Sequence, residues 1–509
     1  MEVLLPLYII IPLGTAFIIP VIGRLWSGFA RLISPVIFLL LLIIGLQHMP
    51  VSNQLVYTVG GWQPVDGIPI GISLVLDGFN ALLLVIINLM AFLASFYAFS
   101  YMQKYTAKNN FYTLLCLMIA GMNGVVLTGD LFNLYVFLEI ASIASYALVA
   151  FGVEKEELEA SFKYQVLGGM ASLLILLAIG LLYWTTATLN MADVSNLLAT
   201  QQDNKIITFI QVLLITGFGL KAAIVPFHAW LPDAHSSAPS PISALLSGVL
   251  IKAIGLYVLF RLLFNVFALS YSISLTILIL GVISMVIGGL LAIGQADYKR
   301  MLAYSSISQV GYIMVATGIG MTVMATNGDT GIAALAIFGA LFHLINHAVF
   351  KGLLFMTAGS VEHATGIRDL NKLGGLARRM PVTSGTSFLG SMAISGLPPF
   401  SGFFSKLIII LAAIQAGYYL VAILAALVSI ITLAYFLRMQ KGIFYGVHAE
   451  GIGKVREAPL TMLFSMTVLA LLCLALSALI IPDIRDIILM PAVDSLMDTI
   501  TYSAITSGV

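Results

Sequence analysis

Residues 217–257 read GFGLKAAIVPFHAWLPDAHSSAPSPISALLSGVLIKAIGLY, and this stretch decides how the chain folds. Two long apolar runs meet here, and each contains one lysine, Lys221 or Lys252. The first run stops at Pro226, which has no backbone N–H and cannot continue a helix, and Pro232 follows soon after. The stretch therefore predicts an interrupted apolar helix and then a second apolar helix, with a charged side chain inside each.

The rest of the 509 residues has the same apolar character. Charged residues make up 9%, against roughly 25% in soluble domains, and the mean hydropathy is +1.07. So few charges cannot cover a water-exposed surface, which excludes a soluble enzyme, a nucleic-acid-binding protein, a disordered chain and a secreted scaffold. The apolar runs of about 20 residues are too long for barrel strands and predict an all-α polytopic membrane protein.

Hydropathy predicts about fourteen transmembrane helices. The segment Gly396-Leu397-Pro398-Pro399 lies inside the twelfth, so we expect this span, like the seventh, to be broken within the membrane. The approximate limits are 3–22, 32–48, 79–103, 111–129, 131–152, 162–184, 206–227, 241–265, 272–293, 301–322, 331–358, 383–416, 418–437 and 460–481.

An internal repeat relates the two halves of the chain. The repeat unit contains five spans, so the second copy must be inverted in the membrane, an arrangement typical of transporters with an ion path near mid-membrane. Three motifs recur, at offsets of 167, 180 and 173 residues: Asp130 and Asp297, Phe162-Lys163 and Phe342-His343, Pro226-Phe227 and Pro399-Phe400. The predicted divisions are helices 1–3 (1–110), repeat one (111–266), repeat two (272–446), and the last span with a C-terminal surface helix (459–509).

Basic residues divide unevenly between alternate loops. Fifteen fall on one side, and only Lys205, Arg261 and Arg485 on the other. Cytoplasmic loops are richer in Lys and Arg, so we expect a multi-pass protein of the inner or plasma membrane with both termini outside. The fifteen are Arg24, Arg31, Lys104, Lys108, Lys155, Lys299, Arg300, Arg368, Lys372, Arg378, Arg379, Arg438, Lys441, Lys454 and Arg456.

The five remaining basic residues fall inside spans and are all lysines: Lys163, Lys221, Lys252, Lys351 and Lys406. An ionised side chain costs a few kcal/mol at mid-bilayer, and a buried lysine can release its proton whereas an arginine cannot. Such residues favour proton translocation. For Lys163, near the end of its span, a static ion pair or a side chain that reaches the membrane surface is an equally good interpretation.

Glu139 is the one acid near the middle of a span. A glutamate beside a lysine in a wet cavity forms a two-state element, because the lysine keeps its proton only while the carboxylate is close. His343 and His347 lie one helical turn apart on one face. They suit a proton relay better than a metal or haem site, which needs more ligands, although a packed histidine is the alternative. His228 and His235 fall at the membrane edge.

Tyr304 and Ser308 are candidate relay groups in the tenth span, or else helix–helix contacts. Cys116 and Cys473 are isolated, so an iron–sulfur cluster would belong to another chain. We expect no catalytic residue, no cofactor and no metal site in this chain.

Val225–Tyr257, together with DYKR at Asp297–Arg300 and LPPFSGFFSK at Leu397–Lys406, resembles the antiporter-like subunits of three kinds of complex. These are respiratory complex I, Mrp-type Na⁺/H⁺ antiporters and energy-converting membrane-bound hydrogenases. The similarity covers roughly residues 70–440, and size and ending resemble the D-type Mrp subunit.

The resemblance implies fourteen helices with helices 7 and 12 broken. It implies a Glu139–Lys221 switching pair, proton transfer through Lys252, and an outlet at Lys406. His343, His347 and Lys351 fall where the family places relay groups between the half-channels. The implied partners are other membrane subunits, the lipid bilayer and protons, with sodium as an alternative cargo.

Two other functions stay open on the sequence. One is an independent secondary transporter of an organic solute, and the other is a haem or quinone redox subunit. The driving reaction is also open, since hydrogen evolution, quinone reduction and sodium/proton exchange are all compatible with this chain.

Overall fold

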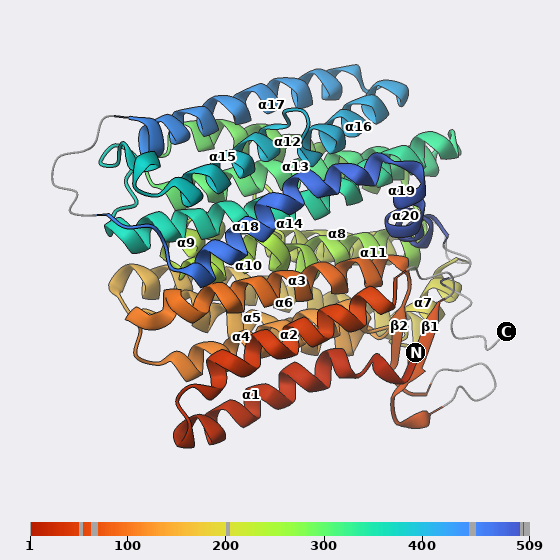
Figure 1. The fold of residues 1–509 in the computed structure, drawn as a ribbon. Coiled ribbons are helices and arrows are strands. Elements are labelled where there is room, and N and C mark those ends of the chain that lie inside the picture. The colour runs from red at the N-terminus through yellow and green to blue at the C-terminus, as the bar shows by residue number, and fades with distance from the viewer. Residues whose placement is uncertain are drawn as a thin grey trace.

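Almost all of the described chain is helical. The computed structural model describes residues 2–49, 54–62, 70–199, 204–446, 455–498 and 502. The long helices run roughly parallel to one another and form one bundle, with short helices and loops at its two ends (Figure 1). The prediction of an all-helical membrane fold is confirmed.

The first part of the chain contains α1 (Leu7–Leu25), α2 (Phe29–Gln47), α3 (Gly78–Tyr101), α4 (Lys108–Leu127), α5 (Leu131–Val149), α6 (Lys155–Thr186), α7 (Met191–Leu198), α8 (Lys205–Lys221), α9 (Trp230–Ser237) and α10 (Ser240–Leu245). The π-helices η4 (Leu246–Leu250), η5 (Lys252–Tyr257) and η6 (Leu262–Val266) and the short α11 (Val258–Arg261) continue α10. The second part contains α12 (Tyr271–Ile293), α13 (Tyr298–Ala325), α14 (Thr330–Thr365), α15 (Pro381–Ser395), α16 (Ser401–Gln415), α17 (Tyr419–Gln440), α18 (Leu460–Ala475), α19 (Pro482–Ile488) and α20 (Met490–Met497). The short 3₁₀ and π segments are η1 (Glu2–Leu4), η2 (Val59–Gly61), η3 (Met102–Lys104), η7 (Leu376–Arg378), η8 (Lys441–Tyr445) and η9 (Leu476–Ile480).

Twelve helices of the described residues are long and apolar enough to cross a membrane. The seventh and twelfth predicted spans are not among the twelve, because each is split into shorter helices. Both predicted interruptions are therefore present, whereas the total of fourteen spans stays a prediction.

One short ribbon departs from the all-helical expectation. Strands β1 (Leu55–Thr58) and β2 (Ser73–Leu76) pair antiparallel, with Leu55 opposite Leu76. They lie within the connection between α2 and α3, which hydropathy treats as a loop. All four residues of β2 are buried, since this strand runs directly into the start of α3.

The break after α8 follows the proline chemistry. Helix α8 ends at Lys221, and the chain turns through Pro226 before α9 begins at Trp230. Backbone polar groups freed inside a membrane must find partners within the protein. The indole N–H of Trp230 donates to Leu220 O over 2.9 Å, and the N–H of Val225 donates to Ser284 Oγ of α12 over 2.9 Å. The interruption is therefore tied to the second repeat.

The break between α15 and α16 uses a different cap. Helix α15 ends at Ser395, and the next residue, Gly396, has a φ of 78°, a left-handed conformation that favours glycine. Ser429 Oγ of α17 donates to Ser395 O over 3.0 Å, and Lys406 Nζ donates to Ile394 O over 2.8 Å. A lysine of α16 thus occupies the open carbonyl end of α15.

The two repeats share an end motif as well as a break. Asp130 accepts from the N–H of Asn133 (2.7 Å) at the start of α5, and Asp297 accepts from the N–H of Arg300 (2.8 Å) at the start of α13. Each aspartate also forms an isolated antiparallel β-bridge with a later loop of its own repeat. Asp130 pairs with Asn190, and Asp297 pairs with Asp369.

These two motifs lie at opposite ends of the bundle. The first is beside α7 and the β-ribbon, and the second is tied to α9, because the guanidinium of Arg368 donates to Ser236 O. Figure 1 shows α7 and the strands at one end and α9 at the other. This is the arrangement expected of inverted repeats. The exact domain limits stay a prediction.

The segment after Pro482 is more compact than a helix lying along the surface. It forms α19 and α20, and Ala492, Val493 and Leu496 of α20 are buried against the start of α3. The N–H of Gly78 donates to Ser495 Oγ over 3.1 Å. Ile500, which the sequence includes in the same helix, lies outside the described residues.

Candidate functional site

Four of the five lysines that the sequence places inside spans are buried in the interior of the helical bundle. Lys221, Lys252, Lys351 and Lys406 expose 2%, 1%, 0% and 3% of their surface. They come from α8, η5, α14 and α16, so both repeats contribute. We call these four residues the lysine row.

Lys221 is the member with a carboxylate nearby. Its Nζ lies 3.8 Å from Glu139 Oε1, which is within ion-pair distance but too far for a hydrogen bond. The ammonium instead donates to Ser142 Oγ (2.9 Å) and Tyr146 OH (3.3 Å), both on α5. The hydroxyl of Ser172 on α6 donates a short bond to Glu139. Each charge is thus held mainly by neutral groups, so the pair can separate without breaking a direct salt-bridge hydrogen bond.

Lys252 is held by backbone oxygen atoms. Its Nζ donates to Ser247 O (2.7 Å) and Gly248 O (2.6 Å). Both carbonyls belong to η4, and a π-helical turn alters the usual backbone hydrogen bonds of a helix, often at functional sites. In the described part of the chain, no carboxylate lies within ion-pair distance of this ammonium.

His343 and Lys406 are linked through adjacent residues of α16. The His343 ring contacts Ser405 Oγ through Nδ1 (3.0 Å) and Gln309 Oε1 through Nε2 (3.1 Å). Lys406, the next residue after Ser405, donates to Ile394 O and to Ser429 Oγ, and its Nζ lies 4.9 Å from the centre of the Tyr312 ring. The structure therefore brings the predicted relay histidine and the predicted outlet lysine together.

His347 and Lys351 follow His343 at one-turn intervals on α14. Lys351 Nζ donates to Leu302 O over 2.7 Å. Both ring nitrogens of His347 are buried without a protein partner. The same is true of Oδ1 of Asn346, the preceding residue, and of Nε2 of Gln309, which contacts His343. Buried polar atoms are normally hydrogen-bonded, and water is the usual partner where protein atoms are lacking. This stretch of α14 thus carries buried polar groups that can still form hydrogen bonds.

Lys163 does not belong to the lysine row. Its side chain is 47% exposed and forms ion pairs with Glu159 (2.8 Å) and Asp233 (3.1 Å). The static ion pair that the sequence left open as an alternative describes this geometry. Lys163 lies near the N-terminal end of α6, where a long side chain reaches the charged groups at that end of the bundle. A relay role for Lys163 stays a prediction.

Arg261 is also placed differently from the prediction. The sequence assigns it to an outer loop, but it is 2% exposed and pairs with Asp77 over 2.7 Å. The two residues are far apart in sequence, so hydropathy gives no sign of the pair. Lys299 likewise pairs internally, with Glu362 at 2.8 Å.

The polar groups of the tenth predicted span mostly join helices. Ser308 Oγ donates to Met285 O of α12 over 2.8 Å. This is a helix–helix contact, which is one of the two interpretations that the sequence allows for Ser308. Tyr304 is half-buried, and its ring lies 6.5 Å from that of His228. A relay role for Tyr304 and Ser308 stays a prediction.

His235 is a buried group that sequence reasoning placed at the membrane edge. It is fully buried, its ring stacks on Phe355 at 4.7 Å, and neither ring nitrogen has a protein partner. The sequence does not predict this burial, because α9 packs against α6 and α13, which are far from it in sequence. Among the described residues, no three His, Cys, Asp or Glu side chains gather as metal ligands would.

Residues 128–432 match the family described as NADH:quinone oxidoreductase/Mrp antiporter, transmembrane region. Residues 62–112 match the family described as NADH-ubiquinone oxidoreductase (complex I), chain 5 N-terminus. The first match covers more than half of the chain and includes every residue of the lysine row as well as Glu139.

Two relatives are similar over most of their length. The N-type subunit of the NADH-quinone oxidoreductase of Desulforudis audaxviator is 36% identical over 89% of this chain and 89% of its own. The D-type subunit of the Na⁺/H⁺ antiporter of Alkalihalophilus pseudofirmus is 35% identical over 83% of this chain and 82% of its own.

Two solved structures have closely similar folds. A chain of the Mrp complex from Dietzia sp. superimposes with a TM-score of 0.89 and 26% identity, covering 100% of this chain and 99% of its own. A chain of the membrane-bound sulfane sulfur reductase, an archaeal respiratory membrane complex, gives a TM-score of 0.88 and 30% identity, with 99% of each chain covered.

Proposed function

Because the chain belongs to the NADH:quinone oxidoreductase/Mrp antiporter family of membrane subunits, we propose that protons cross the membrane along its lysine row. The chain is an antiporter-like subunit of a multisubunit membrane complex. The observation that supports proton movement most directly is the burial of four lysines, of which Lys221 alone has a carboxylate within ion-pair distance in the described residues.

The Glu139–Lys221 pair supplies the switch in this proposal. While Glu139 is near, its charge compensates the buried ammonium. When the carboxylate moves away, an uncompensated ammonium inside the membrane is costly, and the proton leaves for the next acceptor. The hydroxyls of Ser142 and Tyr146 hold the amine in place during this exchange.

The remaining groups form a path through both repeats. In this path, the proton passes from Lys221 to Lys252 and then to the α14 groups His343, His347 and Lys351. From His343 it passes toward Lys406. The contacts of His343 with Ser405 and Gln309 support the last step. The same row disfavours sodium as the cargo within it, because protonated amines repel a metal cation at close range.

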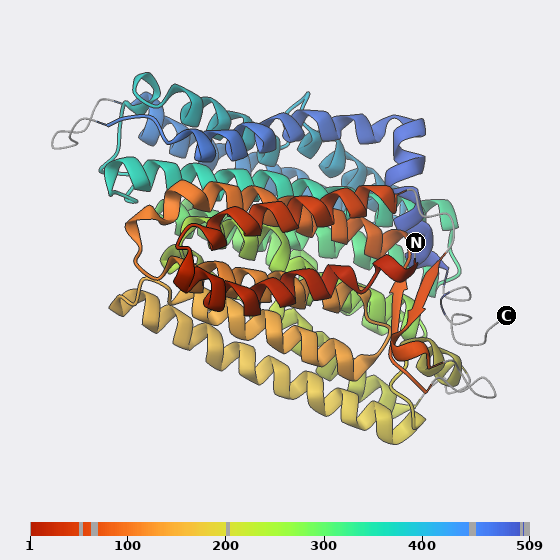
Figure 2. The same ribbon diagram turned by 60° about the horizontal axis from the view of Figure 1, so that its bottom comes forward.

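A neighbouring subunit is needed beside α5. The Glu139 side chain is 27% exposed, and Val136 and Ile143 on the same face are 39% and 61% exposed. Helix α6, which packs beside α5, runs along the lower edge of the bundle in Figure 2. A carboxylate that faces lipid at mid-membrane is costly, so we infer that another subunit of the complex covers this face.

Replacing Lys406 tests the proposed path. We expect Lys406→Gln to slow proton movement by about tenfold or more, because a titratable relay group is lost, and Lys406→Glu to retain most of it. The measurement is the quenching of a pH-sensitive dye in vesicles that contain the whole complex. Companion subunits identified by mass spectrometry define the driving reaction to use.

Two outcomes would contradict the function. Unchanged proton movement in Lys406→Gln would remove the outlet from the path. Uptake of an organic solute by vesicles that contain this chain alone would favour the secondary transporter instead.

Cysteine labelling tests the orientation. We propose that the end with α9 and the loops of Lys104 and Lys372 is cytoplasmic, and that α19 and α20 are outside. Lys372→Cys and Asp486→Cys introduce thiols at positions that are 73% and 55% exposed. In intact cells, a membrane-impermeant maleimide should label only Asp486→Cys.

Labelling of the native cysteines should be weak in this experiment, because Cys116 and Cys473 are both buried. Labelling of Lys372→Cys in intact cells, with Asp486→Cys protected, would reverse the orientation.

A further inference from the structure

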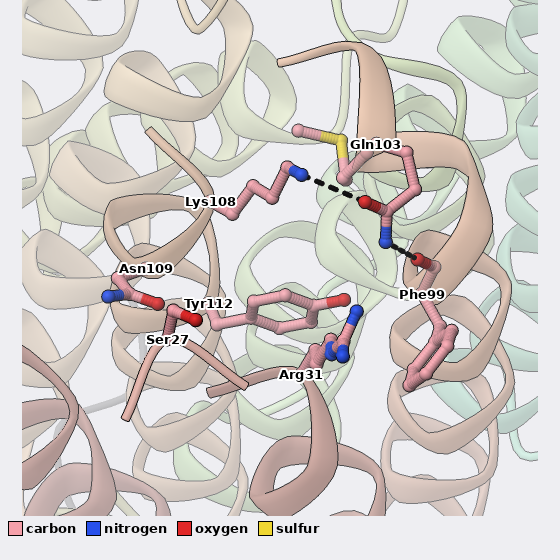
Figure 3. A pocket seen from close by; sticks show the side chains of 8 residues that line it. Ser27, Arg31, Phe99, Gln103, Lys108, Asn109 and Tyr112 are labelled. Atoms are coloured by element: carbon pink, nitrogen blue, oxygen red, sulfur yellow. Dashed lines mark hydrogen bonds between the residues drawn. The ribbon is translucent and has the colours of Figure 1, made fainter. Parts of the chain in front are cut away.

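A small basic pocket lies outside the proton path, between α2, α3 and α4. Its volume is about 140 Å³, and its lining includes Arg31, Gln103, Lys108, Asn109 and Tyr112 (Figure 3). One water needs only about 15 Å³, so the pocket has room for a group of several heavy atoms. It is at the end of the bundle where α1 ends and α4 begins.

The charge in this pocket is uncompensated. Arg31 and Lys108 are cations, and none of the eight lining residues is acidic. The guanidinium of Arg31 lies 4.9 Å from the centre of the Phe99 ring, which fixes its position, and its Nε is buried without a hydrogen-bond partner. A buried donor without a partner costs stability, so this nitrogen indicates a site for an acceptor.

A second charged pocket at the same end shows the contrast. It has a volume of about 170 Å³ and is also lined by cations, Lys163 and Arg300. There, however, Asp233 pairs with both cations and Glu159 pairs with Lys163. Its positive charge is already neutralised within the chain, whereas that of Arg31 and Lys108 is not.

Further donors surround the uncompensated charge. Lys108 and Asn109 are the first two residues of α4, and no side chain caps this helix because its N-cap residue is Ala107. The positive end of the helix dipole and its free N–H groups therefore lie at the pocket, as in many anion sites. Figure 3 shows the hydroxyl of Tyr112 pointing toward Arg31, with Lys108 bonded to Gln103 Oε1 above it at 2.8 Å.

The surroundings place the pocket at the level of lipid headgroups. Trp26, which is 52% exposed, directly precedes the lining residue Ser27 at the end of α1. Tryptophan is enriched at membrane–water interfaces. A tetrahedral phosphate can offer its charged oxygens to a guanidinium, an ammonium and helix N–H groups at the same time.

We propose that this pocket binds a phosphate group, and that an anionic phospholipid headgroup supplies it. Arg31 and the start of α4 hold the phosphate oxygens, and Lys108 contributes charge from the rim. The lipid would join α2 to α4 at a point where the two helices have no ion pair in the described residues.

The test compares three single substitutions in the complete complex, purified in detergent and stripped of lipid. Arg31→Gln and Lys108→Gln remove the pocket cations one at a time. Lys104→Gln is the matched control, because Lys104 is at the same end but stacks on Tyr101 and Tyr105 outside the pocket lining. The probes are phosphatidylglycerol, phosphatidylcholine and inorganic phosphate, and the readouts are lipid retained in native mass spectrometry and the shift in Tm on titration.

We expect phosphatidylglycerol to bind the wild type in preference to phosphatidylcholine. Its affinity should fall by about tenfold or more in Arg31→Gln and about fivefold in Lys108→Gln, and stay within about twofold in Lys104→Gln, whose charge is solvent-screened. Inorganic phosphate should compete weakly and with the same order of variants.

Other results would change or overturn the proposal. Binding of inorganic phosphate that depends on Arg31, without preference for phosphatidylglycerol, would overturn the lipid as the source. Equal phosphatidylglycerol binding by the wild type, Arg31→Gln and Lys108→Gln would overturn the site altogether. Lys108 is only partly buried, so Lys108→Gln keeps the test decisive if Arg31→Gln fails to fold.

Discussion

Lys221→Ala is expected to abolish proton translocation and to leave the complex assembled. The amine of Lys221 is the only member of the lysine row within ion-pair distance of a carboxylate in the described residues, so it alone couples a charge movement to proton release. Loss of a positioned proton-transfer group slows a reaction by roughly 10² to 10⁴. The measurement is the rate of internal pH change in vesicles containing the complex.

Lys221→Arg separates charge from proton exchange. Arginine keeps the positive charge and the hydrogen-bond donors near Ser142 and Tyr146 but does not release its proton at any working pH. We expect it to be as inactive as Lys221→Ala. If Lys221→Arg pumped at the wild-type rate, a fixed positive charge would be sufficient and the exchange of a proton at this site would be disproved.

Lys163→Ala is the matched control for these variants. Lys163 is an equal candidate on composition, but its side chain is 47% exposed and already paired with two carboxylates. Exposed ion pairs contribute only about 0–1 kcal/mol, and we expect at most a small change in rate. A loss comparable to that of Lys221→Ala would return Lys163 to the path.

The contrast between Lys163 and Lys221 shows what hydropathy can predict. Both lysines interrupt apolar runs, and a sliding window measures depth along a helix but not which side of the helix faces its neighbours. The breaks at Pro226 and Gly396 were predictable because proline and glycine act on their own backbone. The end caps at Asp130 and Asp297 are equally local.

Features that depend on distant residues were not predictable. The burial of His235 depends on the direction that α9 takes after the break, and nothing in the neighbouring sequence fixes that direction. The π-helical turns that bring the carbonyls of Ser247 and Gly248 to Lys252 have no signal in the hydropathy pattern. The Arg261–Asp77 pair joins residues separated by 184 positions.

Asp77→Ala is expected to be the most destabilising single substitution outside the path. Asp77 is 1% exposed, and its Oδ1 accepts from the Arg261 guanidinium over 2.9 Å. The same oxygen caps α3 by accepting from the N–H groups of Phe79 and Asn80. Removing one partner of a buried ion pair typically costs about 3–5 kcal/mol, and loss of the cap adds about 1 kcal/mol. The measurement is the Tm of the solubilised complex, followed by size-exclusion chromatography after heating.

Two further variants identify the cause of that loss. Asp486→Ala removes an exposed carboxylate that pairs with Arg485, and it should shift the Tm little. Asp77→Ala combined with Arg261→Met removes both charges and fills the space with an apolar side chain, so it should recover much of the lost stability. An Asp77→Ala complex with the wild-type Tm would show that Asn80 and Asn265, which also accept from Arg261, satisfy the buried guanidinium without the carboxylate.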